Sequence, residues 1–478
     1  MAARGAVINS VFLVGLGGLN LLKTFVVAAF LTASQFGVWS IVLLALAFVG
    51  SLRSVAVGDK YVQQREIDQE EAFQKAFTLE LGGAVILACL MLLVAPLLVV
   101  VYGQGSLLLP AAVGALVLPG LALQAPAWIF YRRMDFLRQR LLTAVDPVVG
   151  FVVTVALAAT GFGYWSLVVG VVAGSWAGGL VAVAASPYRL ALRFDRRTMR
   201  EYLGFSWPLL SAVGAGLAIA QLSVFFGEQA LGLAGAGAIG LAAAYASYTD
   251  RVDSVVTDAL YPAVCRVRER SDLLLEAFTK SNRLALMWGV PFGVGLTLFA
   301  ADLVHFGMGD RWADAIIVLQ VFGVTAAINH IGFNWTAFYR AVGNTRPIAV
   351  VTGAALVAFL AAAIPLLYTH GLGGFAAGIA VVAVVSLIGR FYYLTKLFPG
   401  FQVAFHSARA IAPTIPAVAA VLLFRLAMSG PRTGATALGE LGIYLVVTIV
   451  ATIMLERSLL REALSYVRRP AEGEPQVA

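Results

Sequence analysis

The chain has 478 residues, of which 60% are hydrophobic and only 12% are charged. A soluble globular protein is nearer 45–50% apolar and about 25% charged. Because the apolar excess runs along the whole chain, the composition excludes a sizeable soluble domain. One membrane crossing takes roughly 20 apolar residues, so this length accommodates about 12 to 14 of them. Two cysteines exclude a disulfide scaffold, and the net charge of +8 is typical of cytoplasmic loops and does not indicate nucleic-acid binding.

Apolar runs bounded by charged or turn residues predict the membrane-spanning helices in chain order. There are fourteen, which makes the expected fold class an all-α polytopic membrane protein. The runs are 6–32, 36–58, 76–102, 107–130, 141–160, 164–185, 204–227, 236–260, 284–301, 314–336, 348–368, 374–394, 411–428 and 439–456.

The positions of Lys and Arg predict the orientation of these spans. If the N-terminus is cytoplasmic, 27 of the 33 basic residues fall on the cytoplasmic side, and the outside loops hold only Arg311 and Arg432. Cytoplasmic loops carry the excess of basic residues in membrane proteins. Both termini are therefore expected in the cytoplasm, with 457–478 as a cytoplasmic tail.

Glycine motifs at matching places indicate an internal repeat. Gly161-Phe-Gly-Tyr-Trp opens the sixth span and Gly371-Leu-Gly-Gly-Phe opens the twelfth. Small residues four apart follow each motif, and such faces allow close helix approach. We expect an N-lobe at 1–187, a cytoplasmic linker at 188–203, a C-lobe at 204–396 and two extra helices within 397–456. Each glycine face should pack inside its own lobe. The faces are Gly170, Gly174 and Gly178, and Gly374 and Gly378.

Charged residues inside the apolar runs are the candidate binding residues. A basic side chain at the centre of a span costs roughly 2.5–3.5 kcal/mol on the insertion scale, so it tends to face a partner or a wet cavity. Lys23, Arg53 and Arg251 lie in spans 1, 2 and 8 and are candidate anion ligands. Structural alternatives remain for each residue: snorkelling for Lys23, a cytoplasmic flank for Arg53, and for Arg251 a self-neutralising cluster with Asp250 and Asp253.

Uncharged polar residues form a second group within the runs. Either they line a polar path, as coupling or cavity-lining residues, or they only bond neighbouring helices. Asp250 and Asp253 are also candidates for coupling. The uncharged or titratable members are Asn20, Gln221, Asn329 and His330.

Three further charged residues have simpler expected roles. Arg390 and Arg425 lie near span ends and are expected to snorkel to the interface. Asp146 precedes Pro147, and its carboxylate is expected to satisfy a backbone group that the proline frees.

Motifs of soluble enzymes are absent from the sequence. There is no Gly-Lys-Ser/Thr, hence no P-loop, and no His-Glu-x-x-His. The four histidines are dispersed, which argues against a metal cluster. We therefore expect no catalytic residues, no metal and no cofactor, and a protein that is not an enzyme.

A series of short motifs resembles bacterial polysaccharide flippases of the Wzx type, in the multidrug/oligosaccharidyl-lipid/polysaccharide exporter superfamily. The series covers nearly the whole chain in order. It comprises Gln35-Phe-Gly-Val-Trp-Ser, Val62-Gln-Gln-Arg, Gly163-Tyr-Trp-Ser-Leu-Val, Phe205-Ser-Trp-Pro, Leu260-Tyr-Pro-Ala-Val-Cys-Arg, Val290-Pro-Phe-Gly, Gly309-Asp-Arg-Trp and Ala341-Val-Gly-Asn-Thr-Arg-Pro. The resemblance implies two six-helix lobes in a MATE-like V around a central cavity, plus two extra helices.

The resemblance also implies a function. The cargo would be a polyprenyl-diphosphate-linked oligosaccharide, moved by alternating access across the bacterial cytoplasmic membrane for cell-surface polysaccharide synthesis. Related lipid II flippases place cations in spans 1, 2 and 8, which here hold Lys23, Arg53 and Arg251. Further implied partners are H⁺ or Na⁺, a polysaccharide polymerase and glycosyltransferases. Two alternatives stay open: a cation-coupled small-molecule antiporter of the same fold, and a membrane-embedded glycan polymerase or ligase.

Overall fold

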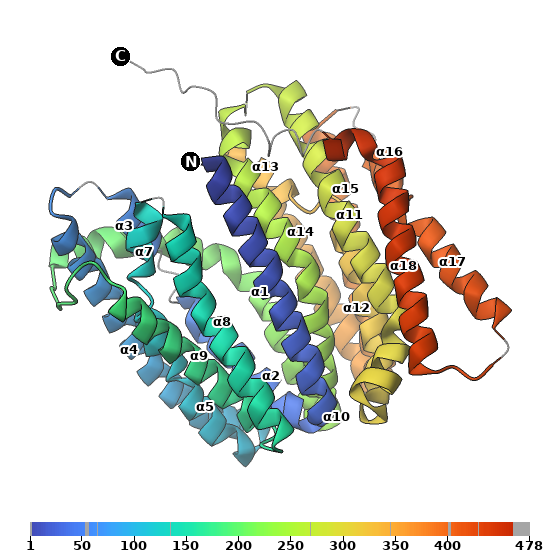
Figure 1. The fold of residues 1–478 in the computed structure, drawn as a ribbon, viewed down its shortest axis with the longest axis horizontal. Helices are drawn as coiled ribbons and strands as arrows, with labels where there is room; N and C mark the ends of the chain where they lie inside the picture. Colours follow the sequence, from blue (N-terminus) through green and yellow to red (C-terminus); the bar gives the residue numbers. More distant parts are fainter. Residues whose placement is uncertain are drawn as a thin grey trace. The chain divides into compact units, whose positions relative to one another are not determined.

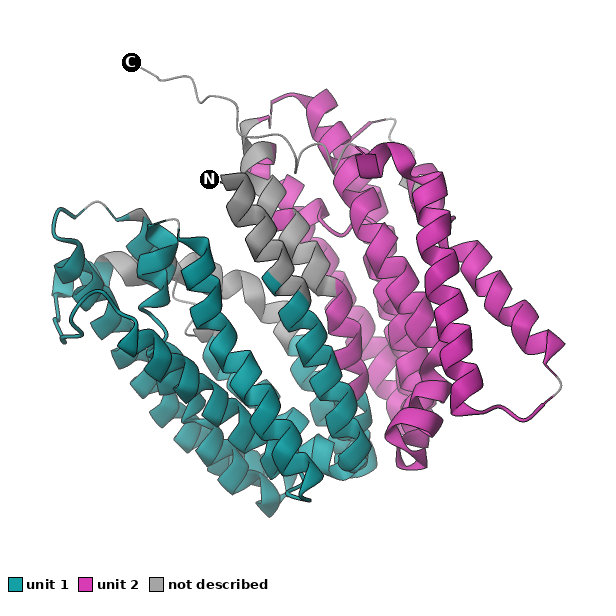
Figure 2. Ribbon diagram, in the orientation of Figure 1, with its two compact units in different colours: residues 1–240 teal, residues 241–478 magenta. Residues whose placement is uncertain are grey.

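A computed structural model describes residues 2–52, 57–64, 66–133, 135–267, 269–344, 346–399, 403–428 and 430–461. Within these residues the chain forms helices joined by short turns and contains no strand. Two compact units divide at Gly240, residues 1–240 and 241–478 (Figure 2), and each is described by itself. The lobe and linker boundaries expected from the sequence remain a prediction.

The first unit contains, in its described residues, nine complete helices and most of a tenth (Figure 1). They are α1 (Ala2–Phe30), α2 (Ala33–Leu52), α3 (Val57–Gln63), α4 (Gln69–Tyr102), α5 (Leu108–Gly114), α6 (Val117–Ala122), α7 (Ala127–Arg132), α8 (Phe136–Ala159), α9 (Trp165–Ala184) and α10 (Arg196–Arg266), with the 3₁₀ turn η1 (Gly105–Leu107).

The second unit takes the end of α10 and the helices that follow it. They are α11 (Ser271–Asp302), η2 (Leu303–Met308), η3 (Asp310–Ala315), α12 (Ile316–Asn329), α13 (Trp335–Ala341), α14 (Arg346–Ala358), η4 (Phe359–Ala363), α15 (Ile364–Leu397), α16 (Val403–Ile411), α17 (Thr414–Ala427) and α18 (Gly434–Leu455).

Two long helices are interrupted at glycines. Gly232 in α10 has φ 69° and ψ −169°, and Gly371 in α15 has φ 61° and ψ −145°. Only glycine adopts a positive φ at low cost. These residues fall between the expected spans 7 and 8 and between the expected spans 11 and 12, so each interruption separates two predicted spans.

The apolar helices agree with a multi-pass membrane protein. By length and composition, the described residues contain ten helical segments able to cross a membrane, or eleven with the bent pair Phe405–Ile411 and Thr414–Ala427. Two of the ten contain the interruptions at Gly232 and Gly371, and α1 contributes the shorter apolar helix Gly15–Phe30. The described helices are therefore consistent with the expected fourteen spans.

The fourth predicted span is broken into α5, α6 and α7. Pro119 lies inside α6, and Pro126 is the N-cap of α7. Proline has no backbone N–H and clashes with the preceding turn, so the prolines favour short helices at this place. The turn between α6 and α7 carries Gln124, and its amide reaches the interior of the first unit.

The glycine face of α9 packs mainly against α8. A Cβ at Gly170 would lie 1.9 Å from Thr154 Oγ1, and one at Gly174 would lie 2.6 Å from the Asp146 carbonyl. A Cβ at Gly178 would lie 2.9 Å from the Gln124 amide nitrogen. The prediction that this face packs within its own lobe is confirmed, because α8 and α9 both belong to the first unit.

The corresponding face of α15 also packs within its unit. A Cβ at Gly374 would lie 2.0 Å from the Leu366 carbonyl, and one at Gly378 would lie 2.2 Å from Ala363 Cα. The prediction is confirmed here as well. Each glycine face allows the two helices of a consecutive pair to approach at backbone distance.

Candidate functional site

Lys23 lies in α1, a helix that packs against α8 in the first unit. Its side chain is half-buried, and its charge acts electrostatically on the Asp146 carboxylate of α8. A lysine whose charge acts on a carboxylate within apolar helices is typical of functional or structural charges in a membrane.

Gln124 completes this polar group. Its Nε2 atom donates a 2.9 Å hydrogen bond to Asp146 Oδ2 and a 3.4 Å bond to the Ser175 carbonyl. The sequence predicts that the Asp146 carboxylate satisfies a backbone group freed by Pro147. That prediction is wrong about the partner. The Asp146 carboxylate accepts its hydrogen bond from the side-chain amide of Gln124, which lies at the break between α6 and α7.

Two other candidate residues of the first unit bond helix backbones. The Asn20 amide donates to the Leu16 carbonyl of its own helix at 3.0 Å. The Gln221 amide, on α10, donates to the Leu44 carbonyl of α2. Both side chains therefore hydrogen-bond to helix backbones. A role for either residue in lining a cavity stays a prediction.

The second unit holds a buried polar layer at the break between α12 and α13. Asn282 Nδ2 of α11 donates to the His330 carbonyl at 2.9 Å, and Asn334 Nδ2 donates to Ser281 Oγ at 2.7 Å. These four residues are between 0 and 6% exposed. The Asn282 amide thereby satisfies the His330 carbonyl, which the broken helix would otherwise leave unpaired in apolar surroundings.

His330 lies at the centre of this layer and is 0% exposed. Its Nδ1 is 2.7 Å from the Ala326 carbonyl oxygen, and its Nε2 is 3.2 Å from the Thr249 carbonyl oxygen of α10. The ring also lies against the backbone of Gly289, where an added Cβ would meet the ring at 2.2 Å.

Arg390 joins the same layer from α15. Its guanidinium donates to the backbone carbonyl of Asn329 and, at 3.1 Å, to the Asn329 side-chain oxygen. The residue is only 6% exposed. The expectation that Arg390 snorkels to the interface is therefore wrong, because protein oxygens bind its charge inside the unit.

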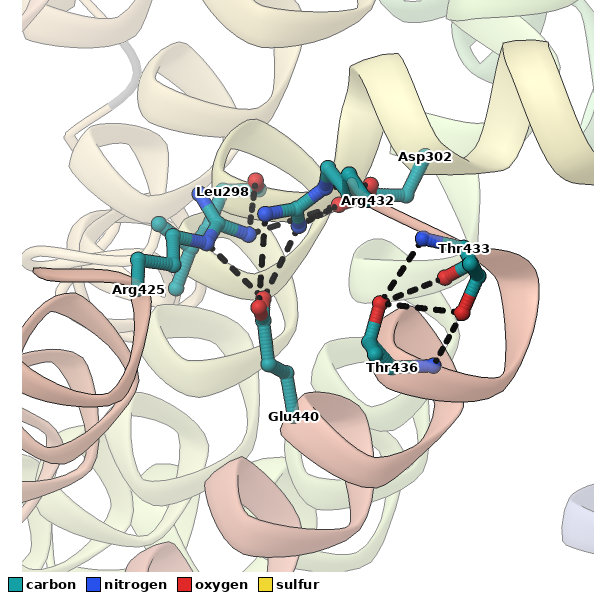
Figure 3. A network of polar contacts seen from close by, with 7 residues as sticks. All are labelled: Leu298, Asp302, Arg425, Arg432, Thr433, Thr436 and Glu440. Carbon is teal, nitrogen blue, oxygen red and sulfur yellow. Dashed lines mark hydrogen bonds and ion pairs between the residues drawn. The ribbon is translucent and has the colours of Figure 1, made fainter. Parts of the chain in front are cut away.

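Arg425 is also expected to snorkel and instead belongs to a four-residue ion network (Figure 3). Its Nε lies 2.8 Å from Glu440 Oε2, and its Nη2 lies 3.3 Å from Asp302 Oδ2. Arg432 bonds the same two carboxylates, with an Nη2–Glu440 Oε2 distance of 2.8 Å. Asp302 is 8% exposed and Glu440 is 2% exposed. This buried network fastens α17 and α18 to the end of α11.

A short sequence repeat, distinct from the glycine motifs, lies near the start of one long helix in each unit. Glu71-Ala-Phe73-Gln-Lys75 begins α4, and Glu276-Ala-Phe278-Thr-Lys280 lies in the first turns of α11. Both phenylalanines are 0% exposed. Both motifs form i,i+4 ion pairs, at 3.2 Å and 2.6 Å. The pattern E-A-F-x-K is a second sequence signal for the internal repeat, which stays a prediction.

Four candidate residues lie outside the described structure. They are Arg53 and the side chains of Asp250, Arg251 and Asp253, so their roles stay predictions. Within the described part of the chain, no group of three or more His, Cys, Asp or Glu residues could hold a metal ion.

The fold and the charged groups inside its helices define a polytopic membrane protein of the MurJ and MATE fold. The structure resembles the lipid II flippase MurJ in an inward closed conformation, with a TM-score of 0.68, 13% identity and coverage of 95% of this chain and 100% of that one. It also resembles an inward-facing multidrug resistance MATE family transporter, with a TM-score of 0.65, 13% identity and coverage of 82% and 98%.

The chain belongs to a family described as polysaccharide biosynthesis protein, whose model matches residues 26–317. It is 24% identical to the succinoglycan biosynthesis transport protein ExoT of Rhizobium meliloti, over 95% of this chain and 93% of that protein. It is 22% identical to the lipopolysaccharide biosynthesis protein WzxC of Escherichia coli, over 69% and 67%. The resemblance to polysaccharide flippases seen in the sequence is confirmed.

Proposed function

We propose that this protein is a flippase that moves a polyprenyl-diphosphate-linked oligosaccharide across the bacterial cytoplasmic membrane. Membership of the polysaccharide biosynthesis family carries the proposal. The fold alone does not choose between cargoes, since a multidrug transporter shares it. The names of the two relatives, a succinoglycan transport protein and a lipopolysaccharide biosynthesis protein, favour a saccharide over a small drug.

The orientation follows from the basic residues. With both termini in the cytoplasm, the positive-inside rule is obeyed along the whole chain. The cargo would then be taken from glycosyltransferases at the inner face and passed to a polymerase at the outer face. Translocation of this kind breaks no covalent bond, so the protein acts as a transporter and not as an enzyme.

The diphosphate of the carrier lipid is the group that the charged residues would bind. A diphosphate carries enough negative charge to offset two or three cations, while the sugars occupy wetter space and the prenyl chain stays in the lipid. Lys23, Arg53 and Arg251 would supply those cations. The electrostatic partnership of Lys23 with Asp146 supports this role, because the carboxylate compensates the lysine charge when no cargo is bound.

Release of the cargo requires a difference between two conformations. A ligand shifts an equilibrium only by its differential affinity for the two states, so binding should be strong in the inward state and weaker in the outward state. Carboxylates beside the cations, Asp146 near Lys23 and Asp250 and Asp253 near Arg251 in sequence, would compete with the diphosphate when the helices rearrange.

Flipping by purified protein in lipid vesicles tests the proposal. We expect Arg251→Ala to abolish translocation of the lipid-linked oligosaccharide while the protein still inserts. Arg251→Lys should retain part of it, because the charge remains but the bidentate fork is lost. Lys23→Ala should weaken it less. Arg346→Ala, at an exposed residue at the start of α14, is the control.

Normal translocation by Arg251→Ala would contradict the anion site. Absence of translocation by the wild-type protein, with lipid-linked saccharides of several compositions, would contradict the function itself.

A further inference from the structure

The surroundings of His330 determine how many protons its ring carries. Both ring nitrogens face backbone carbonyl oxygens, Nδ1 that of Ala326 at 2.7 Å and Nε2 that of Thr249 at 3.2 Å. A carbonyl oxygen only accepts hydrogen bonds. A neutral imidazole has one N–H and one bare nitrogen that is itself an acceptor. Only the imidazolium, with two N–H groups, donates to both oxygens.

The position of His330 in the helix also favours a positive charge. His330 is the C-cap of α12, and the carbonyl end of a helix attracts cations. Because the ring is buried, a bare ring nitrogen would face a carbonyl oxygen, which is itself an acceptor and gives that nitrogen no hydrogen bond.

The ring has little freedom to avoid these contacts. It lies on the backbone of Gly289, whose added Cβ would be 2.2 Å from Cδ2 and 2.8 Å from Nδ1. Interiors packed this closely leave few alternative side-chain positions. The glycine therefore makes the room that places the ring between α11, α12 and α10.

Arg390 is a charged neighbour of His330. Arg390 on α15 binds the Asn329 carbonyl, one residue from His330, and its charge opposes protonation. Asn282 on α11 is neutral and binds the His330 carbonyl. On α10, Thr249 is followed by Asp250, Arg251 and Asp253, a sequence of two carboxylates and one cation. In α12, the residues from 316 to 329 include no charged side chain.

We propose that His330 is a proton-binding site and that its imidazolium ties α10, at Thr249, to the break after α12. The proposal rests on the function proposed above, because Thr249 lies two residues before Arg251, the expected diphosphate ligand. Loss of the proton leaves Nε2 and the Thr249 carbonyl oxygen as two acceptors facing each other, which releases this part of α10. The coupling ion would accordingly be H⁺.

Coupling of this kind is reciprocal. If the proton changes the affinity for cargo, the cargo changes the affinity for the proton by the same factor, typically about 5- to 150-fold. We expect the dissociation constant of the lipid-linked oligosaccharide to change about fivefold or more between pH 6 and pH 8 in the wild-type protein. The change should disappear in His330→Gln, which keeps a polar side chain but does not titrate.

The protonation state can be measured without any transport assay. The full chain, with ¹⁵N-labelled histidine and in lipid nanodiscs, contains four histidines, and the spectrum of His330→Gln identifies the signal of His330. We expect two protonated ring nitrogens at neutral pH. A signal of one protonated and one bare nitrogen would overturn the proposal, even where flipping is intact. His370→Gln, at an exposed residue, is the control for the assignment.

A second variant displaces the ring without removing it. Gly289→Ala would push the imidazole away from its two oxygens, so the ¹⁵N signal should change to that of a neutral ring and the pH dependence of cargo binding should be lost. Gly353→Ala on α14 has open space around the added methyl group and should change neither. An unchanged His330 signal in correctly folded Gly289→Ala would contradict the proposed geometry. Failure of the wild-type protein to bind cargo would overturn the coupling role while leaving the protonation result standing.

Discussion

The side-chain amide of Gln124 donates a 2.9 Å hydrogen bond to the carboxylate of Asp146. The bond connects the break between α6 and α7 with the middle of α8. The break is thereby tied to a residue on which the Lys23 charge also acts, so one carboxylate serves both the helix packing and the candidate binding residue.

Replacing Asp146 should therefore affect stability as well as transport. We expect Asp146→Leu to lower the free energy of unfolding by about 1 kcal/mol or more, because it removes the 2.9 Å acceptor of the Gln124 amide and leaves only the 3.4 Å bond to the Ser175 carbonyl. Asp146→Asn should cost less, since its oxygen still accepts. Thermal unfolding of the detergent-solubilised protein measures both, with exposed Asp314→Leu as the control. Equal stability of Asp146→Leu and the wild type would contradict a structural role.

The contact of α8 with α9 makes a second prediction. Gly174→Leu should sharply reduce the yield of folded protein, because its Cβ alone would be 2.6 Å from the Asp146 carbonyl, and overpacking a close helix pair is destabilising. Gly82→Leu on α4 is the matched control, since nothing lies within 4 Å of an added Cβ there. Size-exclusion chromatography after solubilisation should separate the two. A normal yield for Gly174→Leu would mean that α8 and α9 can separate at little cost.

The ion network of Figure 3 predicts how the last two helices are attached. Glu440→Ala leaves the guanidinium groups of Arg425 and Arg432 without one of their two carboxylates. Removing one partner of a buried ion pair costs of the order of 3 kcal/mol. We therefore expect α17 and α18 to unfold at a lower denaturant concentration in Glu440→Ala than in the wild type.

Limited proteolysis within 430–433, in the connection between α17 and α18, would report the loosening of these two helices. Lys280→Ala, which breaks the exposed Glu276–Lys280 pair, should change stability by less than about 1 kcal/mol. The attachment would be refuted by equal protease resistance of Glu440→Ala and wild type.

The hydrogen bonds of Asp195, a residue outside the predicted spans, predict that the stability of the protein depends on pH. Hydrogen bonds from the Thr198 hydroxyl and backbone N–H hold the pKa of this carboxyl below its usual range. The folded pKa is lower than the unfolded one, so the stabilising contribution is present above about pH 4 and is lost as the pH falls through the lowered pKa. Asp195→Ala should be less stable than wild type at pH 7, and the difference should vanish in acid. A stability difference that persists in acid, below both the folded and the unfolded pKa of Asp195, would contradict it.

The sequence alone determined the apolar runs and the interruptions at Gly232 and Gly371, but not the breaks inside the predicted runs 107–130 and 314–336. Gly232 and Gly371 fall between predicted spans, and the glycine faces of α9 and α15 pack as predicted, because hydrophobic length, turn residues and spacing of small residues act over one or two helices. It also pointed to the family, through motifs that follow one another along the chain.

Only the tertiary structure decided which polar groups meet. Arg390 and Arg425 lie near the ends of predicted spans, yet both bind oxygens from other helices, and Asp146 binds an amide 22 residues away in sequence. Backbone carbonyls decide the most specific of these contacts, at His330. Every residue carries the same carbonyl, so side-chain identities say nothing about which oxygen will face a given ring. That is set by the positions of Thr249 and Ala326 on two packed helices, and the packing of helices far apart in sequence exists only in the folded chain.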